Sequence, residues 1–222
     1  MNIAEALCSR KSIRGYRPDP IPRNTLKEIL DIATRAPSGE NAQPWELVVI
    51  AGDMLHTIGQ TNIEKLNSGI LPHPEVNMPL YKDTYKRRQV DLAIQLFQLM
   101  GITREDKAGR LDWLQRGFRF FDAPAAVFIL LDGSLDMTHT LVDIGTLAQS
   151  ICLAALHHDL GSCIQQQGVF YPDVVRELAG IPQSKRVLLC VTLGYPDNDF
   201  PANQVQSVRE PIEHISTWIG FD

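Results

Sequence analysis

The chain has 222 residues, of which 44% are hydrophobic and 21% charged, the composition of an ordinary soluble globular protein. Lys and Arg total 21 against 26 Asp and Glu, so the net charge of −5 gives no reason to expect nucleic acid or an anionic membrane as a partner. A chain of this length fits one large domain or two small ones. Because it contains no internal repeat, low-complexity tract or long linker, we expect a single domain over residues 1–222.

The sequence has no pattern typical of a membrane span or a secretory signal. The longest uninterrupted apolar run is Ala125–Leu131, far shorter than the ~20 residues that a membrane helix needs. Near the N-terminus, Glu5, Arg10 and Lys11 have no apolar stretch between them, unlike a signal peptide. We therefore expect a cytoplasmic protein that does not bind membranes.

The cysteines and histidines do not predict a metal site. No CxxC pair exists and the gaps between cysteines are long and irregular, which excludes zinc-ribbon and thioredoxin-type patterns. The adjacent His157 and His158 would point about 100° apart on a helix, which does not suit paired metal ligation. We expect reduced and mostly buried thiols at Cys8, Cys152, Cys163 and Cys190.

The N-terminal part of the chain is predicted to form three helices and a strand. A short helix over residues 2–9 precedes a second helix, which begins after Pro22 and is stopped by Pro37. Trp45–Ala51 is expected to be a strand with both faces buried, and Asp53 to cap a helix that runs to about residue 66. The apolar residues at helical spacing in the second helix are Leu26, Ile29, Leu30 and Ala33.

The middle of the chain is predicted to contain a loop, two helices and a central strand. Residues 69–79 hold three prolines and are expected to be a loop. Helical patterns follow near residues 87–100 and 105–118. Ala125–Leu131 is apolar throughout, which predicts a strand in the centre of a sheet.

The C-terminal part begins with the longest predicted helix, over residues 138–158, which Gly161 is expected to end in a left-handed conformation. A short helix over residues 173–179 and a strand over residues 187–193 follow. The tail from residue 194 is rich in Pro and Asn, yet it carries apolar side chains that need a surface to cover, on this subunit or a second one. These side chains are Ile215, Trp218, Ile219 and Phe221.

The order of these elements indicates the fold class. Helices outnumber the three predicted strands, and the two types do not alternate in a regular βαβα rhythm. This pattern predicts an α+β fold, with a small mixed sheet flanked by helices.

Several short strings combine charged or polar groups with turn residues. Residues 10–14, Arg-Lys-Ser-Ile-Arg, suit a phosphate or another polyanion, although a solvated surface has the same composition. The loop 36–45, Ala-Pro-Ser-Gly-Glu-Asn-Ala-Gln-Pro-Trp, either hydrogen-bonds a planar, heteroatom-rich ring or caps local backbone groups. Residues 161–168 either turn backbone amides toward a ligand or form a plain connecting strand and loop. Arg209, alone in the tail, indicates only a surface.

Together these strings occur in the order and spacing of one family, and the chain resembles the FMN-dependent nitroreductases from end to end. The specific part is residues 10–16 and the loop 36–45; Leu160-Gly161-Ser162 and Gly194-Tyr195 with the later Arg209 complete the match. The similarity is greatest to the branch that reduces nitrobenzene or nitrobenzoate. It implies a largely antiparallel mixed sheet flanked by helices. It also implies an interlocked homodimer with exchanged C-terminal tails and two FMN sites at the subunit interface.

The resemblance implies a role for each matched residue. Arg10 and Ser12, with Lys11 beside them, would hold the FMN phosphate together with Arg209. Arg14 would lie near the N1 and O2 edge of the flavin. The residues implied to approach the flavin from the other subunit are Pro37, Ser38, Gly39 and Asn41, and those implied near flavin N5 are Gln165 and Gln166.

The sequence departs from the family pattern in three places. Asp159-Leu160-Gly161 stands where Gly-Leu-Gly is common, and a run of glutamines replaces the glycine-containing pair near flavin N5. Ser207 stands where a second cation of the tail can occur, which would leave the phosphate with one charge fewer.

The implied chemistry is a ping-pong transfer of hydride from NADH or NADPH, through the flavin, to a small nitroaromatic compound, which goes through nitroso to hydroxylamine. A cation at Arg14 would stabilise the negative charge of reduced flavin near N1. The sequence offers no Ser-His-Asp or Cys-His nucleophile and no glycine-rich dinucleotide fingerprint. Aromatic residues that either line the substrate or pack in the core are Tyr81, Tyr85, Phe118, Phe120 and Phe121.

Two further functions stay open at the level of sequence. The same scaffold could reduce quinones, activated alkenes or carbon–halogen bonds, and turnover of each class would separate these enzymes. Alternatively, the chain is a flavin-binding sensor or a flavin-free interaction module. A module would be colourless, and a sensor would be yellow without multiple-turnover oxidation of NAD(P)H.

Overall fold

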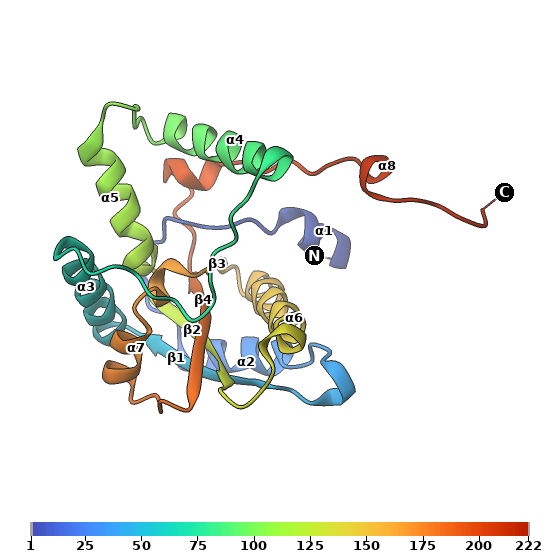
Figure 1. Cartoon of the computed structure of the whole chain (residues 1–222), viewed down its shortest axis with the longest axis horizontal. Coiled ribbons are helices and arrows are strands. Elements are labelled where there is room, and N and C mark those ends of the chain that lie inside the picture. The colour runs from blue at the N-terminus through green and yellow to red at the C-terminus, as the bar shows by residue number, and fades with distance from the viewer. Residues whose placement is uncertain (1, 222) are drawn as a thin grey trace.

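The computed structural model describes residues 2–221 and is built on one four-stranded sheet (Figure 1). The strand order is β1-β2-β4-β3, and all neighbouring strands are antiparallel. Among the described residues, the only parallel pairing is an isolated bridge between Ser12 and Ser162, which joins the N-terminal segment to β3, so the expected largely antiparallel sheet is confirmed. The strands are β1 (Trp45–Ala51), β2 (Ala125–Asp132), β3 (Gly161–Gln165) and β4 (Lys185–Gly194).

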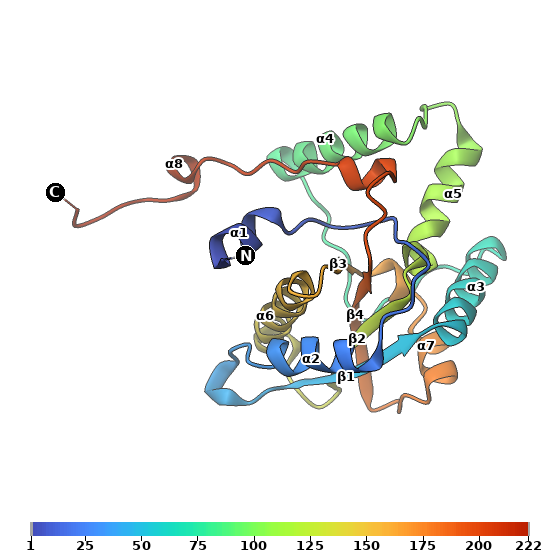
Figure 2. The same cartoon turned by 180° about the vertical axis from the view of Figure 1, so that it is seen from behind.

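Helices flank the sheet on both faces. Two more, α4 and α5, lie beyond the C-terminal end of β4 (Figures 1 and 2). The predicted α+β class is confirmed. The α-helices are α1 (Ile3–Ser9), α2 (Arg23–Ala33), α3 (Asp53–Asn67), α4 (Asp83–Leu99), α5 (Lys107–Phe118), α6 (Met137–Leu156), α7 (Pro172–Ala179) and α8 (Ile212–Ile215).

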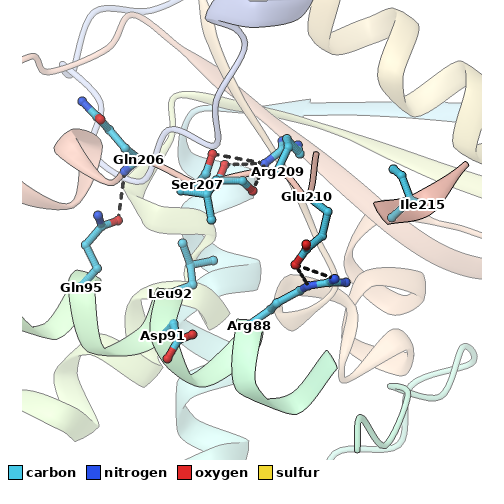
Figure 3. Close-up of a pocket in the computed structure, with 10 residues that line it drawn as sticks. Arg88, Asp91, Leu92, Gln95, Gln206, Ser207, Arg209, Glu210 and Ile215 are labelled. Carbon is cyan, nitrogen blue, oxygen red and sulfur yellow. Dashed lines mark hydrogen bonds and ion pairs between the residues drawn. The ribbon is translucent and has the colours of Figure 1, made fainter. Parts of the chain in front are cut away.

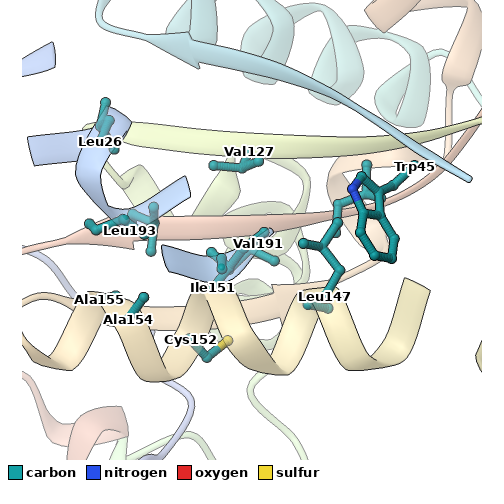
Figure 4. Close-up of a cluster of buried hydrophobic side chains, with 14 of the residues drawn as sticks. Leu26, Trp45, Val127, Leu147, Ile151, Cys152, Ala154, Ala155, Val191 and Leu193 are labelled. Carbon is teal, nitrogen blue, oxygen red and sulfur yellow. The ribbon is translucent and has the colours of Figure 1, made fainter. Parts of the chain in front are cut away.

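Two pairs of helices cover the two faces of the sheet, because successive side chains of β2 point to opposite faces. Val127 and Ile129 belong to the cluster that α2 and α6 complete. Phe128 and Leu130 belong to the cluster that α3 and α7 complete. Figure 4 shows the first cluster, with Ile151 of α6 beneath the strands. Residues 125–131 are at most 3% exposed, so the predicted central strand is confirmed.

The structure corrects the expected role of Gly161 and adds a strand. Residues 161–165 form β3, so the sheet has four strands rather than three. The prediction that Gly161 ends the long helix is wrong: α6 ends at Leu156, and Asp159 takes the left-handed conformation, with φ of 56°. Glycine at 161 provides space instead, because a Cβ there would lie 2.5 Å from Cγ1 of Ile13.

The start of α3 also differs from the expectation. Gly52 is the residue before the helix, with φ of 61°, and Asp53 is the first helical residue rather than the cap. The Asp53 carboxylate therefore lies in the first turn, where the helix dipole favours negative charge. α4 begins at Asp83, four residues before the expected start at residue 87, while the predicted loop over residues 69–79 contains no helix or strand.

The C-terminal tail leaves the body of the chain. After a 3₁₀ turn at Pro201–Gln204, the tail follows α4 and then extends beyond it (Figure 1). Trp218 is 66% exposed, and Ile219 and Phe221 are exposed as well. The apolar end of the tail is thus uncovered by its own subunit.

The long helix α6 has one buried side and one open side. By length and composition it could cross a membrane, with a mean hydropathy of 1.3 over its best window. Ile144, Leu147 and Ile151, however, are buried against the sheet, as in the core helix of a soluble protein. On the other side, Val142 is 69% exposed, which leaves an apolar surface available for a partner.

Candidate active site

The basic segment 10–16 is held in an extended conformation along the edge of the sheet. α1 ends at Ser9, and the Ile13 N–H donates to the Ser162 carbonyl at 2.9 Å beside the parallel bridge. Tyr16 forms a second bridge with Pro196, just after β4. These pairings place the segment directly alongside β3.

A cavity of about 390 Å³ opens beside this segment. Arg14, Gln165 and Gln166 line it together, although 151 residues separate Arg14 from Gln165 in the chain (165 − 14). Apolar and further polar side chains complete its walls: Met78, Phe121, Cys163, Ile164, Gln167, Phe170 and Leu189. A volume of this order suits a small organic ligand with an apolar body and a few fixed polar contacts.

The cations of the segment have no acidic partner in the chain. Within residues 2–221, no Asp or Glu forms an ion pair with the side chain of Arg10, Lys11 or Arg14. Lys11 Nζ donates to the Asn203 carbonyl at 2.6 Å, and Arg14 Nη1 contacts the Ser12 carbonyl at 3.4 Å. Three neighbouring positive charges without compensation favour binding of an anion with several oxygen atoms.

One wall of the cavity is formed by a strained turn after α5. Phe120, Phe121 and Asp122 have φ values of 60°, 54° and 57°. An L residue in this region costs roughly 1–2 kcal/mol, and strain of this kind is concentrated at functional sites. The turn buries Phe121 against the cavity, with its ring centroid 6.0 Å from Arg14 Cζ.

The aromatic residues considered as a substrate cover divide into three groups. Phe118 and Phe120 are core residues of the α3–α7 face. Tyr81 is exposed just before α4, and Tyr85 is exposed in the first turn of that helix. Phe121 alone of the five lines the cavity described above.

The thiols and the phenol near the cavity are not activated groups. Burial raises the pKa of the Cys163 thiol, and burial raises the pKa of Cys152 to about 11. Burial also raises the pKa of Tyr16, whose hydroxyl shares a 2.9 Å hydrogen bond with Thr192 Oγ1. All four cysteines are free, and three are buried, as predicted, while Cys8 is exposed. The buried thiols and the Tyr16 phenol are therefore neutral at pH 7 and supply no nucleophile.

The loop 36–45 lies apart from the cavity, on α6. Thr146 Oγ1 donates to the Pro37 carbonyl at 2.9 Å, and the Gly39 N–H donates to Asp143 Oδ1 at 3.1 Å. Within the loop, the Gln43 N–H donates to Ser38 Oγ at 2.9 Å. Left-handed φ values occur at Glu40 (50°), Asn41 (58°) and Gln43 (48°). The loop is thus strained, fixed to α6 and exposed, and none of its residues lines the cavity of Arg14.

Arg209 also lies outside the cavity of Arg14 in the described chain. Its Nη1 donates to Ser207 Oγ at 2.9 Å, in a separate cavity of about 530 Å³ between the tail and α4 (Figure 3). Next to it, Glu210 pairs with Arg88 at 2.7 Å. The tail therefore follows α4 at this point, with the guanidinium of Arg209 unpaired by any carboxylate within residues 2–221.

The comparison with known proteins agrees with this geometry. A model of the nitroreductase family matches residues 7–195. A nitrobenzene nitroreductase of Ectopseudomonas oleovorans is 30% identical over 221 residues, covering 98% of this chain and 96% of that protein. A chloronitrobenzene nitroreductase of Comamonas testosteroni is 28% identical over 220 residues, covering 98% and 96%.

Solved structures show the same fold. The FMN- and NADPH-dependent nitroreductase NfnB from Sphigopyxis sp. strain HMH superposes with a TM-score of 0.94 at 29% identity, covering 100% of both chains. An FMN-dependent NfnB from Mycobacterium smegmatis, solved with NADPH, gives a TM-score of 0.91 at 23% identity over 97% of each chain. With the family model and these relatives matching over nearly its whole length, the chain belongs to the nitroreductase family.

Proposed function

We propose that this chain is one subunit of a homodimeric, FMN-dependent nitroreductase that uses NADH or NADPH to reduce nitroaromatic compounds. Its relatives reduce nitrobenzene and chloronitrobenzene by name, and a relative of the same fold depends on FMN and NADPH. FMN, when bound, supplies the hydride chemistry, so the protein needs no nucleophile of its own. The observation that carries the proposal is the cavity that brings Arg14 together with Gln165 and Gln166.

The residues present fit such a cofactor at both of its ends. Arg10, Lys11 and Ser12 lie along β3 without acidic partners, which suits a phosphate dianion. Arg14 lies where the same segment reaches the cavity, beside the apolar face of Phe121. A fixed cation in a partly enclosed site stabilises developing negative charge more strongly than it does in water.

The homodimer completes the site. The loop 36–45 carries Pro37, Ser38, Gly39 and Asn41 on a strained, exposed surface that does not reach the cavity of its own chain. The open face of α6, with Val142, and the uncovered end of the tail are apolar surfaces of the kind that obligate dimers bury. We assign the loop to the flavin of the partner subunit and Arg209 to the phosphate.

The chain's own residues then define the reaction. Apolar walls face the ligands in the cavity, and we assign the glutamines at positions 165 and 166, which line it, to the reacting edge of the flavin. NAD(P)H and the nitroaromatic compound enter the same open side in turn, which fits a sequence with no glycine-rich dinucleotide motif. The nitro group is reduced through nitroso to hydroxylamine. We place the enzyme in the cytoplasm, where its reduced cysteines and its nicotinamide supply are found.

An absorption spectrum of the purified protein tests this function directly. We expect a yellow dimer whose visible flavin band bleaches on anaerobic addition of NADPH and returns on addition of nitrobenzene or nitrobenzoate. Parallel turnover with a quinone and a halophenol tests the substrate class, with the nitro compounds expected to be faster. A colourless monomer, or a flavin that NAD(P)H does not reduce, would overturn the proposal.

A further inference from the structure

Asn203 makes a dense set of hydrogen bonds to the segment that carries the proposed flavin contacts. Asn203 is buried, with 3% of the residue exposed. Oδ1 accepts from the Arg14 N–H at 2.7 Å and from the Gly15 N–H at 3.2 Å. Nδ2 donates to the Gly15 carbonyl at 2.7 Å and to the Asp197 carbonyl at 2.8 Å. Every hydrogen-bonding position of the amide is therefore used.

The same residue also contacts the phosphate end of the segment. The backbone carbonyl of Asn203 accepts the 2.6 Å hydrogen bond from Lys11 Nζ. Asn203 therefore touches both Lys11 and Arg14, three residues apart on an extended strand. It does so from the 3₁₀ turn that begins the C-terminal tail.

A second residue, Arg116, bonds the backbone carbonyl of Arg14, whereas Asn203 bonds its N–H. Arg116, near the end of α5, donates from Nη2 to the Arg14 carbonyl at 3.2 Å. Its Nη1 pairs with Asp122 at 2.9 Å, and its Cζ lies 4.6 Å from the ring centroid of Phe200. The backbone N–H and the carbonyl of Arg14 are thus both engaged, one by the tail turn and one by α5.

The packing around Gly15 leaves this backbone little freedom. A Cβ at Gly15 would lie 2.2 Å from Cγ of Phe200, so the ring occupies the space that a side chain would need. Residues 200–203 therefore hold the segment by close packing as well as by hydrogen bonds. A backbone fixed in this way sets the point from which the Arg14 side chain reaches the cavity, and a preorganised cation is the condition for electrostatic stabilisation.

We propose that Asn203 is a positioning residue that sets the guanidinium of Arg14 against the flavin, with Arg116 as its supporting contact. The inference rests on the proposed function, because it takes Arg14 to face the flavin. It adds a residue that does not line the cavity. It also links the start of the tail to the reactivity of the cofactor.

The test measures the two-electron midpoint potential of bound FMN and the rate of its reduction by NADPH. In Asn203→Ala we expect reduced flavin to be disfavoured about tenfold, a shift of about −30 mV, and a similar fall in the reduction rate. Gln204→Ala is the matched control, because Gln204 is the next residue, is exposed and bonds only to the Asn198 carbonyl through its side chain. This control should behave like the wild type.

A double-mutant cycle separates positioning from a general structural role. In an Arg14→Ala background, Asn203→Ala should shift the potential no further, because the group through which it acts is absent. An equal shift in both backgrounds, or a potential for Asn203→Ala equal to that of Gln204→Ala, would overturn the inference.

A second pair of variants covers the case in which Asn203→Ala does not fold. Asn203→Ser replaces the amide by a shorter side chain that keeps one acceptor oxygen, and Arg116→Lys keeps the charge opposite Asp122 but loses the forked donor. Both should shift the potential in the same direction by less than tenfold, and no shift in either would contradict the inference. A wild-type protein without flavin would instead refute the proposed function.

Discussion

The segment 10–16 and the loop 36–45 carry most of the residues that the family resemblance assigns to FMN, yet they differ in how the chain supports them. The first is bound to β3 and to Asn203 and reaches a cavity in its own subunit. The second is exposed, strained and attached only to its own α6. The difference fits the proposed homodimer, in which one half of the site is complete in a single chain and the other half acts on a neighbouring subunit.

Separating the subunits should cause the largest loss of bound FMN. Val142→Glu places a charge on the open face of α6 and would bring two carboxylates together at a two-fold interface. We expect a folded monomer that has lost FMN, measured by light scattering on a sizing column with visible absorbance. Met54→Glu is the control, since Met54 is also exposed but lies on α3. A yellow monomer would show that the loop contributes nothing to the flavin.

Removing a phosphate cation should have the next largest effect. A charge-assisted hydrogen bond contributes roughly 1.5–3 kcal/mol, so Arg10→Ala or Arg209→Ala should weaken FMN binding roughly 10- to 150-fold. Fluorescence titration of the apoprotein with FMN measures it. Arg17→Ala serves as the control, because Arg17 pairs with Asp19 and stacks on Tyr195 instead. Unchanged affinity in either variant would refute the phosphate assignment for that residue.

Removing the cation at the ring should change the chemistry more than the occupancy. Arg14→Ala should slow flavin reduction by NADPH roughly tenfold, about 1.4 kcal/mol in the barrier, with a smaller loss of bound FMN. Stopped-flow absorbance on fully loaded protein separates the two quantities. Arg14→Lys, which retains the charge, should recover part of the rate. Equal losses of rate and occupancy would mean that Arg14 only binds the cofactor.

Loosening the loop should give the smallest effect. Asp143→Ala removes the acceptor of the Gly39 N–H, a hydrogen bond worth about 0.5–1.5 kcal/mol. We expect FMN binding about 2- to 10-fold weaker in an intact dimer, measured by the same titration. Ser150→Ala, which removes only a hydroxyl bonded to the Thr146 carbonyl within α6, should leave the affinity unchanged. A full-affinity Asp143→Ala dimer would show that the loop does not need this anchor.

The sequence predicted elements whose signal is local. Trp45–Ala51 is a strand as expected, but the prediction that both its faces are buried is wrong, because β1 is an edge strand and Val49 is 40% exposed. The apolar run from Ala125 occupies the centre of the sheet, because continuous burial leaves a continuous hydrophobic pattern. For β3 the sequence leaves a connecting strand as only one of two alternatives, since Gly161–Gln165 has neither alternation nor an apolar run. Its pairing with β4 and with Ser12 comes from tertiary contacts that no short window contains.

Only those residues of the candidate site that lie in recognisable short motifs could be predicted from the sequence. Residues 10–14 were marked by charge, and Gln165 and Gln166 by their place after the long helix. Asn203 stands out in the sequence only as a polar residue of the tail, and its role is hidden there because its partners Arg14 and Gly15 lie 189 and 188 residues away. Arg116 is 102 residues from Arg14, and in the sequence it looks like an ordinary surface arginine of a helix. Contacts of this range become visible only in the folded chain.

The three left-handed residues after α5 have a consequence for engineering. Backbone geometry, rather than the sequence of α4 or α5, sets the direction in which Phe121 enters the cavity. The exposed positions of α4 and α5 can therefore be varied together while the turn at residues 120–122 keeps its conformation. Libraries confined to exposed sites such as Val90, Ile94 and Leu111, none of which lines the cavity of Arg14, should retain the cofactor.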